Sequence, residues 1–530
     1  MMESAIVYDE IEYPAYSYPQ IHPDRLATIA RLHGMAPAPP DRCRLLELGC
    51  GCGSNLIPMA LGLPESRFLG IDLASTQISK GRRQIARLGL ANIRMDQLDI
   101  QDFSEDQGLF DYIVAHGLYS WVSETVQEKI FGIIEKCLSP EGVAYVSYNT
   151  LPGGHLRLMV REMLLYHCSR FDSARQKIEE ARFFAELIAK SQIRPNSYGS
   201  LLQQERERVF CRHPHVLFHD ELAECNSNVY FHQFMTQAAH HHLQFLSEAD
   251  PRDVQPTANI EPSAVALLKK LGSETIAGQQ YLDFFLGRRF RQTLLCHSSV
   301  AIDRTVTVDR ITNLLVAANA KPTTSSLVDA SDSEVLFSSV DSKDESASIT
   351  TSHPLMKAVM VCLEDVWPLP ISFQALWDAA HNLLLAWNPP KPFDSCNEWN
   401  CLAKMLFVCY QAGLVELHSW KPHLTSKPGK WPLASPFARL QSLEGDLITT
   451  LRHDQVQIHQ AVNKKLLQLL DGTRDRSMIL HDLQEAVLAS QSPENGGPEL
   501  NETAKRTGEM LDADLDRHLE DFGRLGLLVS

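Results

Sequence analysis

The sequence predicts an α/β fold followed by two accessory regions. Strand-like and helix-like patterns alternate over 44–149, which is typical of βαβ units that build a parallel sheet with helices on both faces. Helical periodicity with few glycines then runs through about 150–315. After residue 353, several helices and a short strand follow in an order that is compatible with winged-helix packing. We therefore expect a sheet domain, a mostly helical middle domain and a C-terminal winged-helix-like domain.

The first region contains five candidate strands and three candidate helices. The strands are short apolar runs, at 44–48, 67–72, 92–100, 110–116 and 142–149. The helices are amphipathic runs, at 55–63, 75–89 and 123–138. Ser75 is the expected N-cap of the second helix, because its hydroxyl can accept from a backbone amide of the first turn. These elements predict one domain over residues 1–150.

The later elements set the remaining boundaries. Further helices are expected at 155–167, 172–191, 261–271, 354–367, 454–488 and from 512, and 397–420 reads as a helix that runs into a strand. Residues 321–352 are rich in serine and threonine, which indicates a linker, although the apolar piece 335–340 could form one arm of a short hairpin. We expect a helical domain at 151–320 and a winged-helix-like domain at 353–530.

Composition and charge exclude several classes of protein. The chain is 44% hydrophobic and 22% charged, as in ordinary globular proteins. Its formal net charge of −16 argues against a general binder of the nucleic-acid backbone. The N-terminus lacks a signal-peptide pattern, and no apolar run approaches the ~18 residues of a membrane span. The twelve cysteines are scattered without zinc-site spacing, which predicts a reducing, cytoplasmic compartment and no metal site.

A glycine-rich turn joins the first strand to the first helix. Gly49, Gly51 and Gly53 stand at alternate positions, and Glu47 comes two residues before them. A dinucleotide site needs the G-x-G-x-x-G spacing, but the sixth position here is Ser54. A carboxylate beside the loop would repel a pyrophosphate, whereas it suits the positive charges of S-adenosylmethionine. The loop therefore favours S-adenosylmethionine over a nicotinamide cofactor.

Two more acids stand at the ends of the second and third strands. Asp72 could accept from the ribose hydroxyls of the ligand, and Asp99 could accept from the adenine amino group. Each of these acids, like Glu47, could instead be a helix N-cap or a surface residue. Their occurrence in order, each at a predicted strand end, favours a ligand because the carboxyl ends of parallel strands share one edge of the sheet.

Longer motifs carry a resemblance to a known family. The first region resembles the class I S-adenosylmethionine-dependent methyltransferases in three motifs, LLELGCGCGSN (45–55), LGIDLA (69–74) and DYIVAHGLYSW (111–121). Further segments look like the bacterial subfamily with a methyltransferase regulatory domain, at 147–155, 218–250 and 279–297. Others are similar to the C-terminal domain of that group, at 431–441, 451–456 and 469–476. The best-known members are rickettsial protein-lysine methyltransferases that act on outer-membrane proteins.

The resemblance implies a Rossmann-like class I methyltransferase sheet, S-adenosyl-L-methionine as cofactor, and a hairpin rather than a free linker at 335–352. Carried over by position, it implies a set of cofactor-binding residues: Tyr18, Glu47, Gly49, Cys50, Gly51, Gly53, Asp72, Leu73, Asp99, Ile100 and His116. Tyr16 and Tyr18 belong to a segment that resembles the family's closing helix, so they are lid candidates. The prolines of an N-P-P-Y motif are missing after the fourth strand, which weakens a nucleic-acid amine as the acceptor.

The acceptor side has three candidate catalytic residues. A lysine ammonium has a reference pKa of about 10.4 and must lose a proton before it can attack, so a dry aromatic channel would help. Tyr119 and Trp121 are the candidates for lining that channel, and His116 for a polar contact or proton acceptor. The two aromatics could equally be core residues, and His116 could be structural. Tyr148 and Asn149, at the end of the fifth strand, are expected to face the edge where ligands bind in open α/β sheets, or else to form a strand-end turn before Pro152 and Gly153.

Three functions compete on this pattern. The large accessory regions favour a protein methyltransferase that acts on lysine, with a protein substrate as partner and neither nucleic acid nor membrane insertion. A methyltransferase for a small molecule is the first alternative, and a cofactor-binding regulator without catalysis is the second. Since accessory domains often serve dimerisation, a homodimer is another role for them. The histidines at 240–242 point in different directions on a helix, so we expect no metal there.

Overall fold

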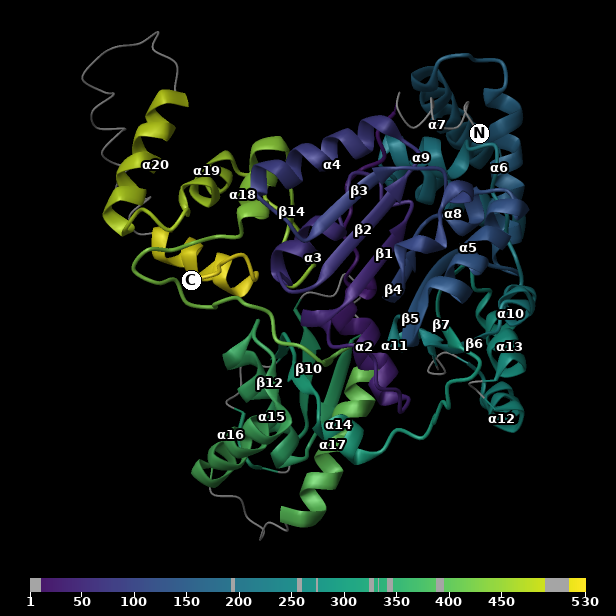
Figure 1. Cartoon of the computed structure of the whole chain (residues 1–530). Coiled ribbons are helices and arrows are strands. Elements are labelled where there is room, and N and C mark those ends of the chain that lie inside the picture. The colour runs from purple at the N-terminus through teal and green to yellow at the C-terminus, as the bar shows by residue number, and fades with distance from the viewer. Residues whose placement is uncertain are drawn as a thin grey trace.

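The computed structural model describes residues 11–191, 196–254, 260–272, 275–323, 328–331, 333–340, 347–387, 395–490 and 514–530. At its centre lies a seven-stranded sheet with the order β3-β2-β1-β4-β5-β7-β6 (Figure 1). Five strands are the predicted ones and run parallel: β1 (Arg44–Leu48), β2 (Arg67–Asp72), β3 (Ile93–Gln97), β4 (Phe110–Ala115) and β5 (Leu138–Asn149). The predicted parallel α/β core is confirmed.

Two further strands come from the region that was predicted to be helical. β7 (Phe290–His297) pairs antiparallel with β5, and β6 (Leu243–Glu248) pairs antiparallel with β7. The prediction missed both, because a short apolar run such as 293–296 cannot be told from a buried piece of helix by periodicity alone. The sheet is therefore mixed, and part of the span predicted as a separate middle domain completes it.

Helices cover both faces of the sheet. One face packs against α2 (Pro23–Leu32), α3 (Leu56–Gly62) and α4 (Ser75–Leu88), and the other against α5 (Glu124–Cys137) and α10 (Phe231–His240). The two faces of the sheet form two hydrophobic cores. Because side chains alternate along a strand, Leu45 packs into the first core and Leu46 into the second. Ser75 is the first residue of α4 rather than its cap, which is Ala74.

The remaining middle helices pack beside the sheet (Figure 1). A helical bundle with its own core comprises α6 (Gly154–Cys168), α7 (Ala174–Lys190), α8 (Ser197–Cys211) and α9 (Pro214–Glu221). Of the two other helices, α13 (Ile276–Leu286) packs against α10, and α12 (Pro262–Leu271) packs against α13. The predicted helices at 155–167, 172–191 and 261–271 are thus present. Within the described ranges, no helix combines the length and apolar character that crossing a bilayer requires.

The C-terminal half contains two hydrophobic cores, and the span predicted as one domain, 353–530, contributes to both. The first unit comprises β8 (Leu315–Ala317), β9 (Ala320–Pro322), β10 (Val335–Ser339), β11 (Ser348–Thr351), α15 (Pro354–Val366), α16 (Phe373–Ala386), α17 (Ser395–Gln411) and β13 (Glu416–His418). The second comprises α18 (Pro436–Glu444), β14 (Leu447–Thr449), β15 (Gln455–Gln457), α19 (Ala461–Leu469), α20 (Arg476–Ser490) and a helix over 514–524. Because β10 and β11 pair antiparallel, the hairpin alternative for 335–352 is the one observed.

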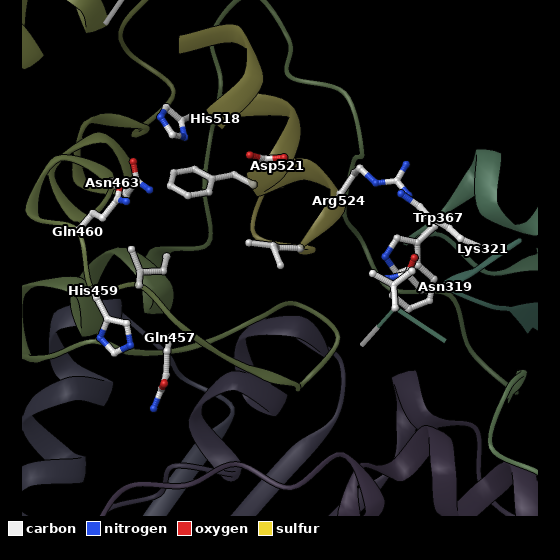
Figure 2. A pocket seen from close by; sticks show the side chains of 14 residues that line it. Asn319, Lys321, Trp367, Gln457, His459, Gln460, Asn463, His518, Asp521 and Arg524 are labelled. Atoms are coloured by element: carbon white, nitrogen blue, oxygen red, sulfur yellow. The ribbon is translucent and has the colours of Figure 1, made fainter. Parts of the chain in front are cut away.

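A cleft of about 510 Å³ separates these two units (Figure 2). Lys321 and Trp367 line it from the first unit, and His459, Asn463 and Arg524 line it from the second. None of its lining residues comes from the glycine loop, so this cleft is distinct from the edge of the sheet where the sequence places the cofactor.

Candidate cofactor and acceptor site

The glycine loop turns sharply between β1 and α3. Gly49, Gly51 and Gly53 all have positive φ, at 73°, 53° and 78°, a conformation that residues with a Cβ rarely adopt. A Cβ on Gly53 would stand 2.8 Å from the sulfur of Met95, whereas a Cβ on Gly51 would meet nothing within 4 Å. The loop is thus tightly packed at Gly53 and faces open space at Gly51.

The amides at the start of this loop bond within the protein. The amides of Gly49 and Cys50 both donate to the Ile71 carbonyl, at 2.9 and 3.0 Å. The Gly51 amide donates to Oδ2 of Asp72 at 2.8 Å. A phosphate cradle needs such amides to point at the ligand. These three are engaged elsewhere, which agrees with the sequence argument against a dinucleotide.

Glu47 is a buried carboxylate with one unpartnered oxygen. Its exposed fraction is 2%, and Oε1 accepts from Nδ2 of Asn55 at 2.7 Å. Oε2 has no hydrogen-bond partner among the described residues. Burial raises the pKa of Glu47 to about 8, with the Asn55 hydrogen bond opposing this shift and the charge of Asp72 adding to it. A ligand ammonium fits this position, because it would satisfy both the orphaned oxygen and the missing positive charge.

The two strand-end acids have local hydrogen bonds of their own. Oδ1 of Asp72 accepts from the Ala74 amide at 2.8 Å. Oδ1 of Asp99 accepts from the Gln101 amide at 2.9 Å and caps a short 3₁₀ helix, so the capping interpretation holds for Asp99. Each carboxylate oxygen has two lone pairs, so capping leaves room for a ligand donor. The apolar residues that follow the two acids are Leu73, 36% exposed, and Ile100, 9% exposed.

Cys50 packs beneath the loop. Its amide bonds to the Ile71 carbonyl, and its own carbonyl accepts from the Gly53 amide at 2.9 Å. Its sulfur lies so close to Gly70 that a Cβ there would approach it to 2.7 Å. The thiol is therefore buried against β2, and the predicted role of Cys50 in the cofactor set stays a prediction.

The N-terminal segment lies over the loop. The ring of Tyr18 stands 3.9 Å from the ring of His116, centroid to centroid. The Tyr18 amide donates to Oδ1 of Asn55 at 3.0 Å, and the Ser54 hydroxyl donates to the Tyr16 carbonyl at 2.6 Å. Asn55 thus bridges the lid segment to Glu47. The structure brings Tyr18, Glu47 and His116, which are far apart in the sequence, to one edge of the sheet.

His116 follows β4 and is neutral. Nδ1 of its ring lies 2.9 Å from the hydroxyl of Tyr145, on the neighbouring strand β5. Burial lowers the pKa of His116 to about 4. Gly117 comes next with φ of 61°, and its amide donates to the Ser147 hydroxyl at 2.8 Å. The chain therefore turns away from the sheet directly after His116 and leaves the imidazole at the edge.

Tyr119 lies in the core, so the prediction that it lines an acceptor channel is wrong. Its exposed fraction is 0%, and its ring packs edge-on against Phe131 and Phe234. Its hydroxyl donates to the side chain of Gln237. The short 3₁₀ helix after Gly117 turns this ring toward α5 and α10, on the face opposite the lid. The core interpretation that the sequence left open is the correct one.

The other three aromatic or polar candidates are at least half-buried. Trp121 has a buried Nε1 with no hydrogen-bond partner among the described residues, so its role stays a prediction. Tyr148 stacks on Phe234 in the same core as Tyr119. Asn149 is 1% exposed, and its Oδ1 accepts from Arg157 at 3.2 Å. Tyr148 and Asn149 therefore follow their structural interpretation.

Sequence analysis missed three residues that the structure places at the site. Asn55 joins Glu47 to the lid, and Tyr145 and Gln292 form a hydrogen-bonded chain behind His116. Asn55 could have been noticed from its place directly after the glycine loop. No local pattern identifies Gln292, because it reaches the site only through the pairing of β7 with β5.

Comparisons with known proteins give the family. Three family models match, described as "Methyltransferase domain" over 40–204, "Predicted methyltransferase regulatory domain" over 213–297, and "PKMT, C-terminal winged helix domain" over 431–527. An uncharacterised protein of Rickettsia prowazekii, RP789, is 32% identical over 484 residues, which cover 91% of this chain and 85% of the relative. This chain belongs to that methyltransferase family. It is an S-adenosylmethionine-dependent methyltransferase with a regulatory domain and a winged-helix domain.

Solved structures extend the likeness along the whole methyltransferase. The structure of PKMT2 from Rickettsia typhi in complex with AdoHcy superposes with a TM-score of 0.85 at 29% identity, covering 98% of this chain and 100% of that one. A second uncharacterised protein of R. prowazekii, RP028, is 38% identical over 234 residues, which are 44% of this chain and 94% of the relative. The predicted family, cofactor and fold class are confirmed.

Proposed function

We propose that this methyltransferase transfers a methyl group to lysine side chains of proteins. The observation that carries the proposal is the match along almost the whole chain to PKMT2, together with the PKMT winged-helix model at 431–527. The cofactor sheet is common to many methyltransferases, so its likeness alone would not indicate a substrate. Here the likeness also includes the accessory units, which would contact a large substrate. Because the eleven described cysteines are all free, we also propose a reducing, cytoplasmic compartment.

The cofactor-binding residues follow from the loop and the strand ends. When bound, S-adenosylmethionine supplies a methyl group that its sulfonium has already activated. Glu47 would hold the ammonium of the cofactor, because its orphaned oxygen is aimed at no other donor. Asp72 would accept from the ribose hydroxyls and Asp99 from the adenine amino group. The remaining contacts proposed are the backbone or apolar surfaces of Tyr18, Gly49, Cys50, Gly51, Gly53, Leu73, Ile100 and His116.

An aromatic path leads to His116 from the bundle side. The rings of Tyr13 and Tyr16 are 6.5 Å apart, those of Tyr16 and Tyr18 are 6.4 Å apart, and Tyr18 covers His116. Burial, followed by the negative charge of Asp220, raises the pKa of Tyr16. Aromatic faces and a nearby carboxylate attract a lysine ammonium, and desolvation then favours its neutral form. These features support a lysine as the acceptor.

A labelling experiment tests the proposal. The protein is incubated with radiolabelled S-adenosylmethionine and a cell extract, and labelled products are separated into protein, nucleic-acid and small-molecule fractions. We expect label in protein, and mass spectrometry should place it on lysine. The Glu47→Gln variant in parallel should lose most of the signal. Label confined to small molecules or nucleic acid would overturn the proposal, as would the absence of any turnover by protein that binds the cofactor.

A further inference from the structure

We propose that Tyr145 and Gln292 are positioning residues that hold the proton of His116 on Nδ1, so that Nε2 presents a lone pair to the acceptor amine. This inference deepens the proposed lysine methylation and rests on it for the identity of the amine. It gives the regulatory region a specific task, because Gln292 belongs to the matched regulatory domain while His116 and Tyr145 belong to the cofactor sheet.

The hydrogen bonds determine where the ring proton lies. The Tyr145 hydroxyl donates to Oε1 of Gln292 at 2.8 Å. A tyrosine hydroxyl has a single proton to donate, so its oxygen accepts in its other contact. That contact is Nδ1 of His116 at 2.9 Å, and Nδ1 is therefore the donor. In a neutral imidazole only one nitrogen is protonated, which leaves Nε2 with its lone pair.

The surroundings of the ring agree with this assignment. The imidazole is neutral at physiological pH, since burial lowers its pKa to about 4. The Ser147 hydroxyl lies 3.4 Å from Nδ1 and accepts from the Gly117 amide, so it can also accept weakly from Nδ1. No described residue forms a hydrogen bond with Nε2. The lone pair is thus available at the edge where Tyr18 covers the ring.

A rigid frame holds Gln292 behind Tyr145. β5 and β7 are paired in register, with Ser147 opposite Gln292. The Gln292 amide donates to Oε2 of Glu248 at 3.0 Å. Glu248 in turn forms a buried ion pair with Arg291 at 2.5 Å. Outer partners of this kind fix the tautomer and orientation of a functional histidine.

The lone pair would orient the reaction. An N–H of the neutral lysine amine donates to Nε2 of His116, which turns the nitrogen lone pair toward the methyl carbon. The new N–C bond forms as the C–S bond breaks, and the electron pair of the C–S bond stays on sulfur. The methylated ammonium then releases one proton to water, because a histidine with so low a pKa does not retain it. Positioning of this kind is the main contribution a protein makes to an already activated transfer.

The first test is spectroscopic and needs no acceptor. In protein labelled with ¹⁵N-histidine, a long-range ¹H–¹⁵N correlation spectrum distinguishes protonated from unprotonated ring nitrogens, and a His116→Asn spectrum identifies the signal. We expect the proton of His116 on Nδ1 in the unmodified protein. In Gln292→Met, the Tyr145 hydroxyl is free to donate to Nδ1, and the proton should move to Nε2. A proton on Nε2 in the unmodified protein would overturn the inference.

The second test is kinetic. Gln292→Met and Tyr145→Phe should lower kcat about 10- to 100-fold, the range expected for loss of an outer partner. The dissociation constant for AdoHcy should stay the same, which a general loss of structure would not allow. Tyr112→Phe is the matched control, because Tyr112 is a buried tyrosine on β4 in the same core and donates to the Ala38 carbonyl instead. Normal kcat in Gln292→Met with a switched tautomer would contradict the inference.

A pair of replacements at His116 separates the two ring nitrogens. The amide of glutamine can place an oxygen near the position of Nε2, whereas that of asparagine reaches only the position of Nδ1. We expect His116→Gln to retain more kcat than His116→Asn, and the reverse order would argue against the inference. Should lysine labelling fail altogether, the tautomer spectrum still decides the positioning role, so the two proposals fail separately.

Discussion

The two sides of the site are built in different ways. The carboxylate side, which comprises Glu47, the glycine loop and Asp72, lies within 47–72 and on two adjacent strands. The lid side comprises Tyr18, His116, Tyr145 and Gln292, which come together only after the sheet has formed. The residues proposed to bind the cofactor are therefore close together in the sequence, whereas the side proposed to face the acceptor depends on contacts between distant segments.

The lid side is also held by the C-terminal units. The Ser17 and Thr449 hydroxyls lie 3.3 Å apart, and the side chain of Gln455 donates to the Ala15 carbonyl at 3.1 Å. In α2, directly after the lid, Arg25 forms an ion pair with Glu416 at 2.5 Å. These contacts couple the position of the lid to both C-terminal units. The hydrogen bonds described above for Glu47, the glycine loop and Asp72 do not involve those units.

The largest effect should follow from Asp24, at the base of the lid. Its buried carboxylate accepts from the amides of Ser419 and Trp420, at 2.7 and 2.9 Å, and pairs with His418 at 2.6 Å. Asp24→Asn should lower the free energy of unfolding by about 3–5 kcal/mol, the cost of breaking a buried pair. Chemical denaturation measures this, with the exposed Asp41→Asn as control. Equal effects of the two substitutions would show that the buried contacts of Asp24 do not stabilise the protein as proposed.

The same carboxylate predicts a pH dependence. Burial opposes ionisation, but the charge and hydrogen bond of His418 outweigh it and lower the pKa of Asp24 to about 2. A lowered folded-state pKa means that this stabilisation is complete above about 4 and is lost as the pH falls through about 2. The acid-side decline in stability should therefore be weaker in Asp24→Asn than in the unmodified protein.

Glu47→Gln, on the carboxylate side, should have the next largest effect, which is on cofactor affinity. Removal of the charge that faces the cofactor ammonium should weaken binding of AdoHcy about 10- to 100-fold, since a hydrogen bond to a charged group contributes about 1.5–3 kcal/mol. Calorimetry measures the change. Glu65→Gln, at an exposed acid on the loop before β2, is the control. Unchanged affinity in Glu47→Gln would mean that the ammonium binds elsewhere.

Cofactor binding should also release the proton that Glu47 carries. Because burial raises its pKa to about 8, the cofactor-free protein carries this proton at neutral pH. Unfolding returns the pKa to its ordinary 4.5, so between about 4.5 and 8 this group makes the protein less stable as the pH rises, by up to about 1.4 kcal/mol per unit. AdoHcy binding near pH 7 should release a proton, measured by calorimetry in buffers of different ionisation enthalpy. Glu47→Gln should abolish the release.

A smaller effect is expected where the winged-helix unit holds the lid. Gln455→Ala removes the hydrogen bond to the Ala15 carbonyl and should weaken AdoHcy binding about five-fold, which corresponds to about 1 kcal/mol. Limited proteolysis should cut the lid segment faster in this variant. The control is Gln457→Ala, on the same strand β15 with an exposed side chain. Identical behaviour of both variants would show that the lid closes without this unit.

The smallest effect should come from Tyr119. Tyr119 is a core residue whose hydroxyl donates to Gln237. Tyr119→Phe should therefore lower the free energy of unfolding by about 1 kcal/mol and leave kcat and KM unchanged. Steady-state kinetics and thermal unfolding measure both quantities. A fall in kcat without a loss of stability would show that Tyr119 acts on the acceptor after all and is not only a core residue.

Much of the fold could be predicted from the sequence because its signals are local. Alternating strand and helix patterns over 44–149 marked all five parallel strands, and Glu47 with its glycines indicated the class of cofactor. The errors arose where a residue's place depends on packing. Tyr119 follows the fourth strand as a channel residue would, but its ring turns into the α5 and α10 core. β7 and β6 were missed because their place in the sheet depends on pairing with β5 and with each other.

Residues close together in the chain were enough to predict the parallel sheet, the glycine loop and the class of cofactor. Only the tertiary structure decided what stands behind His116 and what holds Tyr18. Those partners lie on β5, on β7 and in the C-terminal units, and hydrogen bonds between distant segments of the chain produce no periodic pattern in the sequence. The physical reason is that pairing and packing, rather than local propensity, bring such groups within bonding distance.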